Sequence, residues 1–387
     1  MRDVITTVEK WIEDGKAFAL ATVVNTQKSA PRPAGAVMIV GQDGEVLGSV
    51  SGGCVEGAVY EIAQQVLEDG EPVLERFGYD DSDAFAIGLT CGGIIDIYVE
   101  RISSDSFPQL PDFLSDVKAG KPVALVTVVE HPAAHRIGKR LIVRPDEVEG
   151  TIGNSRADDA VAGDARALLA AGTTSLITYG PAGERMDTGM KVFVSSFQPS
   201  PRMIVFGAID FAAALARAGA LVGFHVTVCD ARMVFATRAR FPTADQVVVA
   251  WPHIYLKQQL REGKIDNRTV ICVLTHDPKF DVPVLDVALR LGRDRKPAYI
   301  GAMGSRSTHE DRLRRLGEKG LSSSQMSELH SPIGLDLGGR TPEETAISIV
   351  AEVIAKRYGG SGKPLRKSHL EAVHPDNHHF QREGKAG

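Results

Sequence analysis

The sequence is short of cysteine, of positive charge and of long apolar runs, and each shortage excludes a class of protein. Its 387 residues hold four cysteines, too few for a disulfide framework. The net charge of -5 argues against nucleic acid as the main partner, because phosphate binding needs a basic face. No apolar run approaches the roughly 18 residues that cross a bilayer, and the amphipathic N-terminal stretch lacks a signal-peptide pattern. We therefore expect a cytoplasmic protein with reduced thiols and no membrane or nucleic-acid partner.

A duplication is visible in the first half of the sequence. GKAFALATVV begins at Gly15, and GKPVALVTVV begins at Gly120. The stretches 48–70 and 150–172 have equal length, so their register offset is 150 − 48 = 102. Each copy alternates apolar strands with one helical stretch, which predicts two similar units packed as one domain. Chance similarity between two αβ units is the alternative, and the unbroken register makes duplication the better interpretation.

Comparing the two copies divides the stretch SGGCVE, which begins at Ser51, into two parts. Glu56 corresponds to Asp158, so both copies place an acidic residue at the positive end of a helix. Cys54 corresponds to Arg156, so the thiol occurs in the first copy alone. Because a structural requirement of the unit should appear in both copies, we expect Glu56 to be structural and Cys54 to be chemical.

The second half predicts a different fold. From residue 201 onward, short apolar strands alternate with helical stretches, as in a doubly wound parallel sheet. Gly207 lies in the first strand-to-helix turn, and Asp230 ends the second strand, where a dinucleotide fold places its ribose-binding acid. Ile209 replaces the glycine that lets the backbone approach a pyrophosphate. We predict a Rossmann-like domain in which an ordinary NAD(P) site is disfavoured.

The loop after the expected fourth strand is a better candidate for a ligand site. Thr275, His276 and Asp277 follow this strand, and open α/β sheets bind ligands at the carboxyl ends of their strands. The alternative, to which we give equal weight, is that Asp277 caps the next helix and His276 is merely exposed.

The loop after the expected fifth strand is the second candidate. Its proposed ligand-binding residues are Gly301, Gly304, Ser305 and Arg306. The two glycines permit a backbone nest, and Arg306 can meet an anion. Ser307 with Glu310 is typical of a capping box, which alone would explain that serine. Thr341 with Glu344 predicts a second capping box, which is purely structural.

The expected fold class is therefore α/β. An N-terminal α+β domain with an internal duplication is followed by a Rossmann-like doubly wound parallel sheet. The expected boundaries are 1–198 for the first domain (repeat units about 15–101 and 120–197), 199–360 for the second and 361–387 for a polar tail. The tail contains His374, His378 and His379, which are weak evidence for a metal site, so a solvated end is the preferred interpretation.

These motifs together resemble the XdhC/CoxI family, the accessory proteins of xanthine dehydrogenase and related molybdenum hydroxylases. GSVSGGCVE and CGGIIDIYVE are similar to the family's N-terminal motifs. VLTHDPKFD, YIGAMGSRSTHEDRL and SPIGLDLGGRTPEETAISIVAEVIA are similar to its Rossmann-type domain. The family usually has G-A-G-H at the glycine turn, where this chain has Gly207-Ala208-Ile209-Asp210.

The resemblance implies a chaperone of the molybdenum cofactor rather than a catalyst. Such a protein binds the cofactor, protects it while a cysteine desulfurase replaces an oxo ligand with sulfur, and delivers it to the apo-hydroxylase. We also expect a homodimer. The alternatives are an NAD(P)-dependent oxidoreductase with a degenerate dinucleotide site and a docking scaffold without a ligand.

The chemistry of this cargo selects candidates among the residues. A thiolate suits a soft metal, so Cys54 is the first candidate for contacting molybdenum or carrying sulfur, and Cys91 is the second. Beside Ser51, the backbone N–H groups of Gly52 and Gly53 are candidates for holding an oxyanion or the cofactor's phosphate. Both cysteines can also be small residues in tight turns. The other two cysteines, Cys229 and Cys272, lie in apolar strands and are expected in the core.

Overall fold

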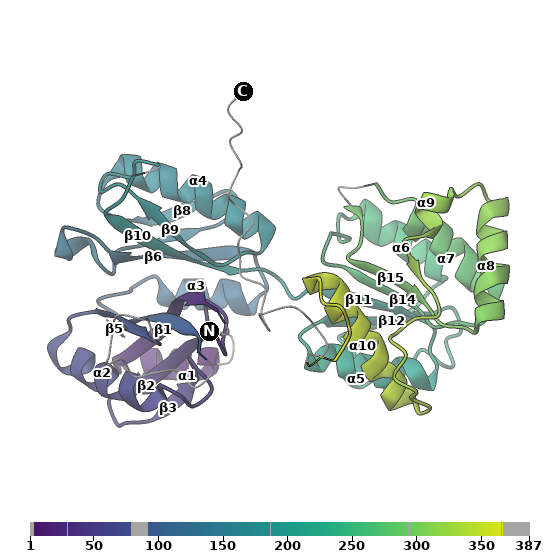
Figure 1. Cartoon of the computed structure of the whole chain (residues 1–387), viewed down its shortest axis with the longest axis horizontal. Helices are drawn as coiled ribbons and strands as arrows, with labels where there is room; N and C mark the ends of the chain where they lie inside the picture. Colours follow the sequence, from purple (N-terminus) through teal and green to yellow (C-terminus); the bar gives the residue numbers. More distant parts are fainter. Residues whose placement is uncertain are drawn as a thin grey trace. The chain divides into compact units, whose positions relative to one another are not determined.

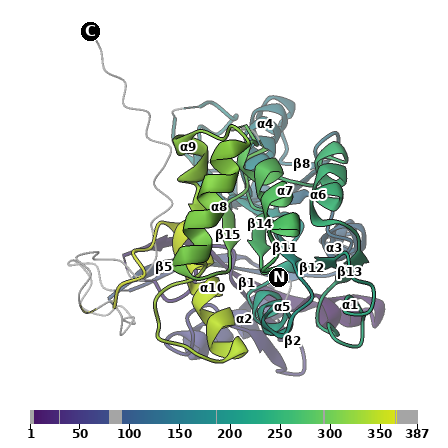
Figure 2. The ribbon, with the colours of Figure 1, turned by 90° about the vertical axis from the view of Figure 1, so that its right-hand side faces the viewer.

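The computed structural model describes residues 4–28, 30–78, 92–185, 187–292, 295–364 and 366. Within these residues the chain forms two compact units, one ending at Pro199 and the other beginning at Ser200, and each is described by itself. Figures 1 and 2 show the ribbon, with the labels of helices and strands. No helix in the described ranges is both long enough and apolar enough to cross a membrane.

The first unit repeats one succession of elements. The first copy contains α1 (Ile5–Glu13), β1 (Phe18–Gln27), β2 (Val37–Gly41), β3 (Val46–Gly48), α2 (Glu56–Asp69), β4 (Val73–Phe77) and β5 (Ile94–Ile102). The second contains α3 (Leu110–Lys118), β6 (Val123–Glu130), η2 (Ala134–Arg136), β7 (Arg140–Val143), β8 (Val148–Thr151), α4 (Ser155–Ala171), β9 (Ser175–Tyr179) and β10 (Met190–Phe197). Their sheets have equivalent strand orders, β3-β2-β1-β5-β4 and β8-β7-β6-β10-β9. The duplication also includes helices α1 and α3, which the sequence comparison left out.

Glycines at matching positions help to explain why the two copies fold alike. Gly48 ends β3 with a φ of +80°, and a Cβ atom there would lie 2.3 Å from the carbonyl oxygen of Val37. Its counterpart Gly150 has a φ of +94°, and a Cβ atom there would lie 2.5 Å from the carbonyl oxygen of Arg140. Neither site has room for a side chain, so both copies need glycine where the chain leaves this hairpin.

The two sheets of the first unit pack face to face, with α2 and α4 on the outer faces (Figure 1). The inner faces meet in a buried cluster of Val24, Tyr98, Val129 and Phe193. Val24 and Val129 occupy the same position in the two copies, because they end the matching stretches GKAFALATVV and GKPVALVTVV. The contact is therefore nearly symmetric, with each copy offering the same face of its sheet to the other.

A buried ion pair joins the two copies. Arg140 on β7 donates a hydrogen bond to the carboxylate of Glu100 on β5, and the two side chains are only 11% and 8% exposed. The Arg140 guanidinium also lies 4.7 Å from the ring centre of Phe107. Burial alone would lower the pKa of Arg140, but the charge of Glu100 raises it, so the guanidinium stays protonated. The pair thus joins the copies through charges shielded from water.

The second unit is a parallel sheet covered on both faces. It contains β11 (Arg202–Phe206), α5 (Asp210–Leu221), β12 (His225–Asp230), β13 (Gln246–Val249), α6 (Pro252–Arg261), β14 (Val270–Val273), α7 (Pro278–Leu289), β15 (Tyr299–Ala302), α8 (Arg306–Glu318), α9 (Ser323–Met326), β16 (Leu329–His330) and α10 (Pro342–Tyr358). Helices α5 and α10 belong to one apolar core, and α6, α7 and α8 to the other. The strand order β13-β12-β11-β14-β15-β16 is that of a Rossmann fold, which confirms the predicted fold class.

Candidate functional site

The loop before α2 is organised around the carboxylate of Glu56. The backbone N–H groups of Ser51, Gly52 and Gly53 donate to its two oxygens at 2.9, 2.9 and 2.8 Å. The hydroxyls of Ser49 and Ser51 donate to it at 2.7 and 2.5 Å. Glu56 therefore fills, from within the chain, the position that an anionic ligand would take.

These bonds correct the expectation that Gly52 and Gly53 present free N–H groups to a cofactor. Their amides face an internal carboxylate, which satisfies both donors. Asp158 does the same in the second copy, accepting from the Thr151 hydroxyl and the Ile152 amide at 2.8 Å each. This repetition supports the expected structural role of the acidic residue.

The charge of Glu56 is strongly stabilised. Burial raises the pKa of this carboxyl, but the hydrogen bonds from Ser51 and Ser49 outweigh burial and lower the pKa to about 2. Because the folded pKa lies below the ordinary value of 4.5, the ionised group stabilises the fold above pH 4.5. This contribution is lost as the pH falls from 4.5 toward about 2.

Replacing Glu56 with glutamine should therefore lower the free energy of unfolding by about 1–2 kcal/mol at neutral pH, allowing for solvent screening of a partly exposed group. The difference from wild type should shrink as the pH falls from 4.5 toward about 2, the interval between the ordinary pKa of the carboxyl and its pKa in the folded protein. Urea unfolding at a series of pH values measures both effects. Glu61→Gln, at an exposed site on the same helix, is the control and should change little. A pH-independent difference would contradict the role given to the charge.

Cys54 lies where the two copies differ in backbone structure. Helix α4 begins at Ser155, the counterpart of Gly53, whereas α2 begins three residues later, at Glu56. The first copy thus lacks one turn of helix and has an irregular loop in its place. Cys54 is exposed in this loop, and its backbone N–H donates to the Ser51 hydroxyl at 2.9 Å. The loop presents the thiol side chain at the surface, which suits the chemical role predicted for it.

Of the remaining cysteines, two are buried in the second unit and one lies outside the described residues. Cys229 and Cys272 have no exposed surface, as expected for core residues. Burial, with a smaller effect of the Asp230 charge, raises the pKa of the Cys229 thiol to about 12, and burial raises that of Cys272. Neither is a thiolate at neutral pH. Cys91 lies outside the described residues, as do the three tail histidines.

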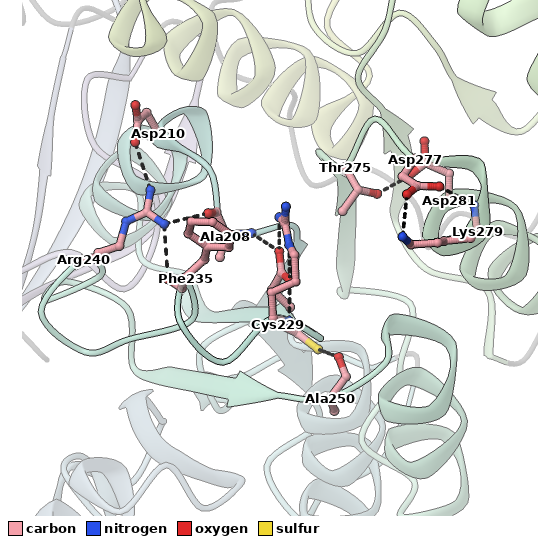
Figure 3. A network of polar contacts seen from close by, with 12 residues as sticks. Ala208, Asp210, Cys229, Phe235, Arg240, Ala250, Thr275, Asp277, Lys279 and Asp281 are labelled. Carbon is pink, nitrogen blue, oxygen red and sulfur yellow. Dashed lines mark hydrogen bonds and ion pairs between the residues drawn. The ribbon is translucent and has the colours of Figure 1, made fainter.

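The glycine turn of the second unit lies where the strand order reverses, between β11 and β14. Gly207 has a φ of +114°, and a Cβ atom there would lie 3.0 Å from the backbone nitrogen of Thr275. Ile209 is the N-cap residue of α5. Asp210 occupies the first turn of the helix, and its carboxylate pairs with Arg240 at 3.0 Å (Figure 3). A carboxylate at this helix start opposes the binding of a pyrophosphate.

The side chain of Asp230 is also committed within the protein. Its carboxylate accepts the Ala208 amide at 2.7 Å and the Arg232 amide at 2.8 Å. The Arg232 guanidinium adds bonds at 2.8 and 3.0 Å. Burial raises the pKa of Asp230, but these bonds prevail and the pKa is lowered. The carboxylates of Asp210 and Asp230 thus have partners within the protein, and the geometry of this turn gives no support to an NAD(P) site.

The loop after β14 combines structural residues with one exposed histidine. Asp277 is the N-cap residue of α7, and accepts the Lys279 amide at 3.0 Å (Figure 3). Thr275 is buried, and its hydroxyl donates to Asp281. His276 is exposed. The capping alternative is therefore correct for Asp277.

Beneath this loop lies a buried ion pair. Arg312 donates to Asp281 at 3.0 Å, and the two side chains are 2% and 4% exposed. Arg312 also donates to the Met303 carbonyl and the Ser331 hydroxyl, both at 2.8 Å. These bonds tie the loop after β15 to helices α7 and α8, and no sequence motif indicated them.

The loop after β15 differs from the predicted nest. Gly301 belongs to the strand, where a Cβ atom would lie 2.6 Å from the side chains of Tyr299 and Ile333, so it serves packing. Gly304 has a φ of +151°. The cap of α8 is Ser305, which accepts the Thr308 amide at 3.2 Å. The capping box predicted at residues 307 and 310 was therefore wrong, because the helix begins earlier.

Other predictions at this edge of the sheet fared differently. The capping box of Thr341 and Glu344 at the start of α10 is confirmed. Arg306 is the first residue of α8 and is exposed, so it remains available to an anion.

Among the described residues, no group of three or more His, Cys, Asp or Glu side chains could hold a metal ion.

Comparison with known proteins agrees with this architecture. The model described as the XdhC Rossmann domain matches residues 203–353, and that of the XdhC and CoxI family matches residues 11–78 and 117–180, within the two copies. The chain is 30% identical to a protein from Bacillus subtilis (strain 168) described as a probable subunit of xanthine dehydrogenase, over 91% of this chain and 97% of that protein.

Two further similarities extend over most of the chain. It is 28% identical to the molybdenum cofactor insertion chaperone PaoD from Escherichia coli (strain K12), over 89% of this chain and 84% of that protein. A crystal structure described as a xanthine dehydrogenase from Bacillus halodurans shares the fold, with a TM-score of 0.66 and 24% identity over 95% of this chain and 98% of that one. The chain belongs to the XdhC and CoxI family.

Proposed function

We propose that this protein is an accessory factor for a molybdenum hydroxylase of the xanthine dehydrogenase type. It binds the molybdenum cofactor, shields it while a cysteine desulfurase exchanges an oxo ligand for sulfur, and delivers it to the apo-enzyme. It acts in the cytoplasm as a homodimer. The observation that carries the proposal is the similarity to a cofactor insertion chaperone along both units of the chain.

The exposed thiol supports a role in holding this cargo. The cofactor brings its own metal, bound by the dithiolene sulfurs of a pterin, so the protein has no need of a complete metal site. One soft ligand suffices to contact such a metal, and Cys54 is the exposed cysteine of the described residues. The Glu56 carboxylate holds Ser51, Gly52 and Gly53 in place, so these residues position the loop rather than contact the cargo.

The second unit contributes a smaller set of candidates than the sequence suggested. The side chains of Asp230, Thr275 and Asp277 already have partners within the protein. His276 and Arg306 are exposed at the carboxyl edge of the sheet, and we propose these two for contact with the cofactor or the hydroxylase.

The test is the metal and pterin content of protein purified without oxygen from a host that makes the cofactor. Wild type should carry molybdenum and pterin, and Cys54→Ala should lose most of the molybdenum, because the soft ligand is gone. Cys54→Ser replaces the sulfur with oxygen at similar size and should also lose the metal. Since Cys54 is exposed, both variants should keep the wild-type unfolding midpoint.

Two results would count against parts of the proposal. Wild-type protein without molybdenum and pterin would favour a docking scaffold. A Cys54→Ala protein that retains its molybdenum and fully supports hydroxylase maturation would show that the thiol is not the contact.

A further inference from the structure

A groove of about 260 Å³ opens between the two copies of the first unit. It is lined by Arg32, Pro33, Ala34, Gly35, Ala36, Val37, Gly48, Ser49, Thr174, Ser195, Ser196 and Phe197. The first eight come from the first copy and the last four from the second. At its inner end the groove continues into a small cavity that shares Gly35, Val37, Ser195 and Phe197. The groove is therefore a joint feature of the two copies.

The groove lies where the near-symmetry of the two copies is broken. Glu100 pairs with Leu20 in the first sheet as Ser195 pairs with Leu125 in the second, so Ser195 is the counterpart of Glu100. Cross-strand pairing with the matching threonines, Thr22 and Thr127, likewise makes Val37 the counterpart of Arg140. On one side of the interface the Glu100–Arg140 ion pair fills the space, whereas on the other a serine and a valine leave it open.

The open side carries one positive charge and several hydroxyls. Arg32 is exposed at the mouth between Pro31 and Pro33, and the two rings restrict the backbone that presents it. Among the described residues it has no ion-pair partner. The Thr174 oxygen accepts the Ser196 amide at 3.1 Å, which leaves the hydroxyl proton free to be donated. An arginine with neighbouring hydroxyl donors is suited to a phosphate or another oxyanion.

The groove also touches the loop that holds the exposed thiol. Ser49 is part of the groove wall. Its hydroxyl accepts the Gly52 amide at 2.9 Å and donates to Glu56 at 2.7 Å. A ligand in the groove would thus contact a residue that is bonded directly to the Cys54 loop.

We propose that this groove binds the phosphate ester end of a ligand through Arg32, Ser195 and Thr174. The inference rests on the proposed function, in which that ligand is the phosphorylated pterin of the cargo. The volume of the groove lies below the roughly 300–1,000 Å³ of pockets that enclose whole drug-sized ligands, so the groove suits a phosphate group and the atoms that attach it. Free phosphate shares this chemistry, and the experiment separates the two sources.

The experiment titrates the full-length protein with three probes: a pterin carrying a phosphate ester on its 6-substituent, the same pterin without phosphate, and inorganic phosphate. Pterin fluorescence reports binding of the first two, and competition with the phosphorylated pterin reports the third. Arg32→Gln should weaken binding of the phosphorylated pterin about ten- to a hundredfold, because a charge-assisted hydrogen bond is lost. It should leave the weaker binding of the dephosphorylated pterin unchanged.

Two further variants make the result specific to the groove. Ser195→Ala should weaken phosphorylated pterin less than Arg32→Gln does. Arg156→Gln, an exposed arginine of the second copy outside the groove, should have no effect. Equal affinity of wild type and Arg32→Gln for the phosphorylated pterin would overturn the groove as its site while leaving the proposed function standing. Arg32-dependent binding of inorganic phosphate without any binding of the pterin would support the phosphate site and count against the cofactor as cargo. Absence of binding by all three probes would overturn the groove proposal.

Discussion

Replacing Arg312 with methionine is expected to destabilise the second unit by about 3–5 kcal/mol. The substitution leaves the Asp281 carboxylate buried without its cation, and it removes donors to the Met303 carbonyl and the Ser331 hydroxyl. Burial already raises the pKa of Asp281 against the opposing effects of Thr275 and Arg312, so the remaining charge has little compensation. Methionine fills similar space, so the loss reports mainly on the charge.

The two tryptophans allow the units to be followed separately, since Trp11 lies in the first and Trp251 in the second. Urea unfolding of Arg312→Met in a Trp11→Phe background, followed by the fluorescence of Trp251, measures the effect. Arg314→Met is the matched control on the same helix, because its side chain is 56% exposed and pairs with Asp311 at the surface. It should cost no more than about 1 kcal/mol. Equal costs for the two variants would show that the Arg312 pair is not the desolvated contact described above.

Replacing Arg140 with valine is the second large expected effect, at about 3–5 kcal/mol for the first unit. The change leaves the Glu100 carboxylate buried between the two sheets without its cation, and it removes the guanidinium from the Phe107 ring. Valine is well suited to an internal strand, so strand propensity does not oppose the substitution. Unfolding followed by Trp11 in a Trp251→Phe background is the measurement.

A double variant tests whether the cost arises from the unpaired charge. Glu100→Ser together with Arg140→Val copies the pairing of Ser195 with Val37 on the other side of the interface. Removing both charges should recover at least about 1–2 kcal/mol of the loss, because no buried carboxylate remains. A double variant that is less stable than Arg140→Val alone would show that the unpaired carboxylate is not the source of the cost.

The duplication in the first unit could be predicted from the sequence because the two copies keep a constant offset in residue number. Equal spacing between Gly48 and Gly70 and between Gly150 and Gly172 revealed the duplication, and the structure shows why the first glycine of each stretch is required. Helices α1 and α3 escaped the comparison because their sequences share apolar spacing rather than residues.

The candidate site was less predictable, because its decisive contacts depend on how side chains fold back. Nothing in the order Ser-Gly-Gly-Cys-Val-Glu shows that Glu56 turns toward the amides of Gly52 and Gly53. The partnership of Asp281 with Arg312 joins residues 31 positions apart on two helices. Gly301 was misassigned to a nest because a glycine packed in a strand and a glycine in a loop look alike in sequence. The chemical role predicted for Cys54 rests on the second copy as an internal reference, and the exposure of this residue in the structure suits that role.

The nearly symmetric contact between the sheets bears on how the first unit assembles. One copy alone would expose a sheet face that carries its part of the cluster around Tyr98 and Phe193, and it would pair with a second copy in a two-fold arrangement. Joining the copies in one chain turns that encounter into an intramolecular step, at an effective concentration on the order of millimolar. It also frees the two edges of the contact to differ. One edge holds the Glu100–Arg140 ion pair, and the other is open as the groove beside Val37 and Ser195. Identical protomers related by a two-fold axis would have the same residues at both edges.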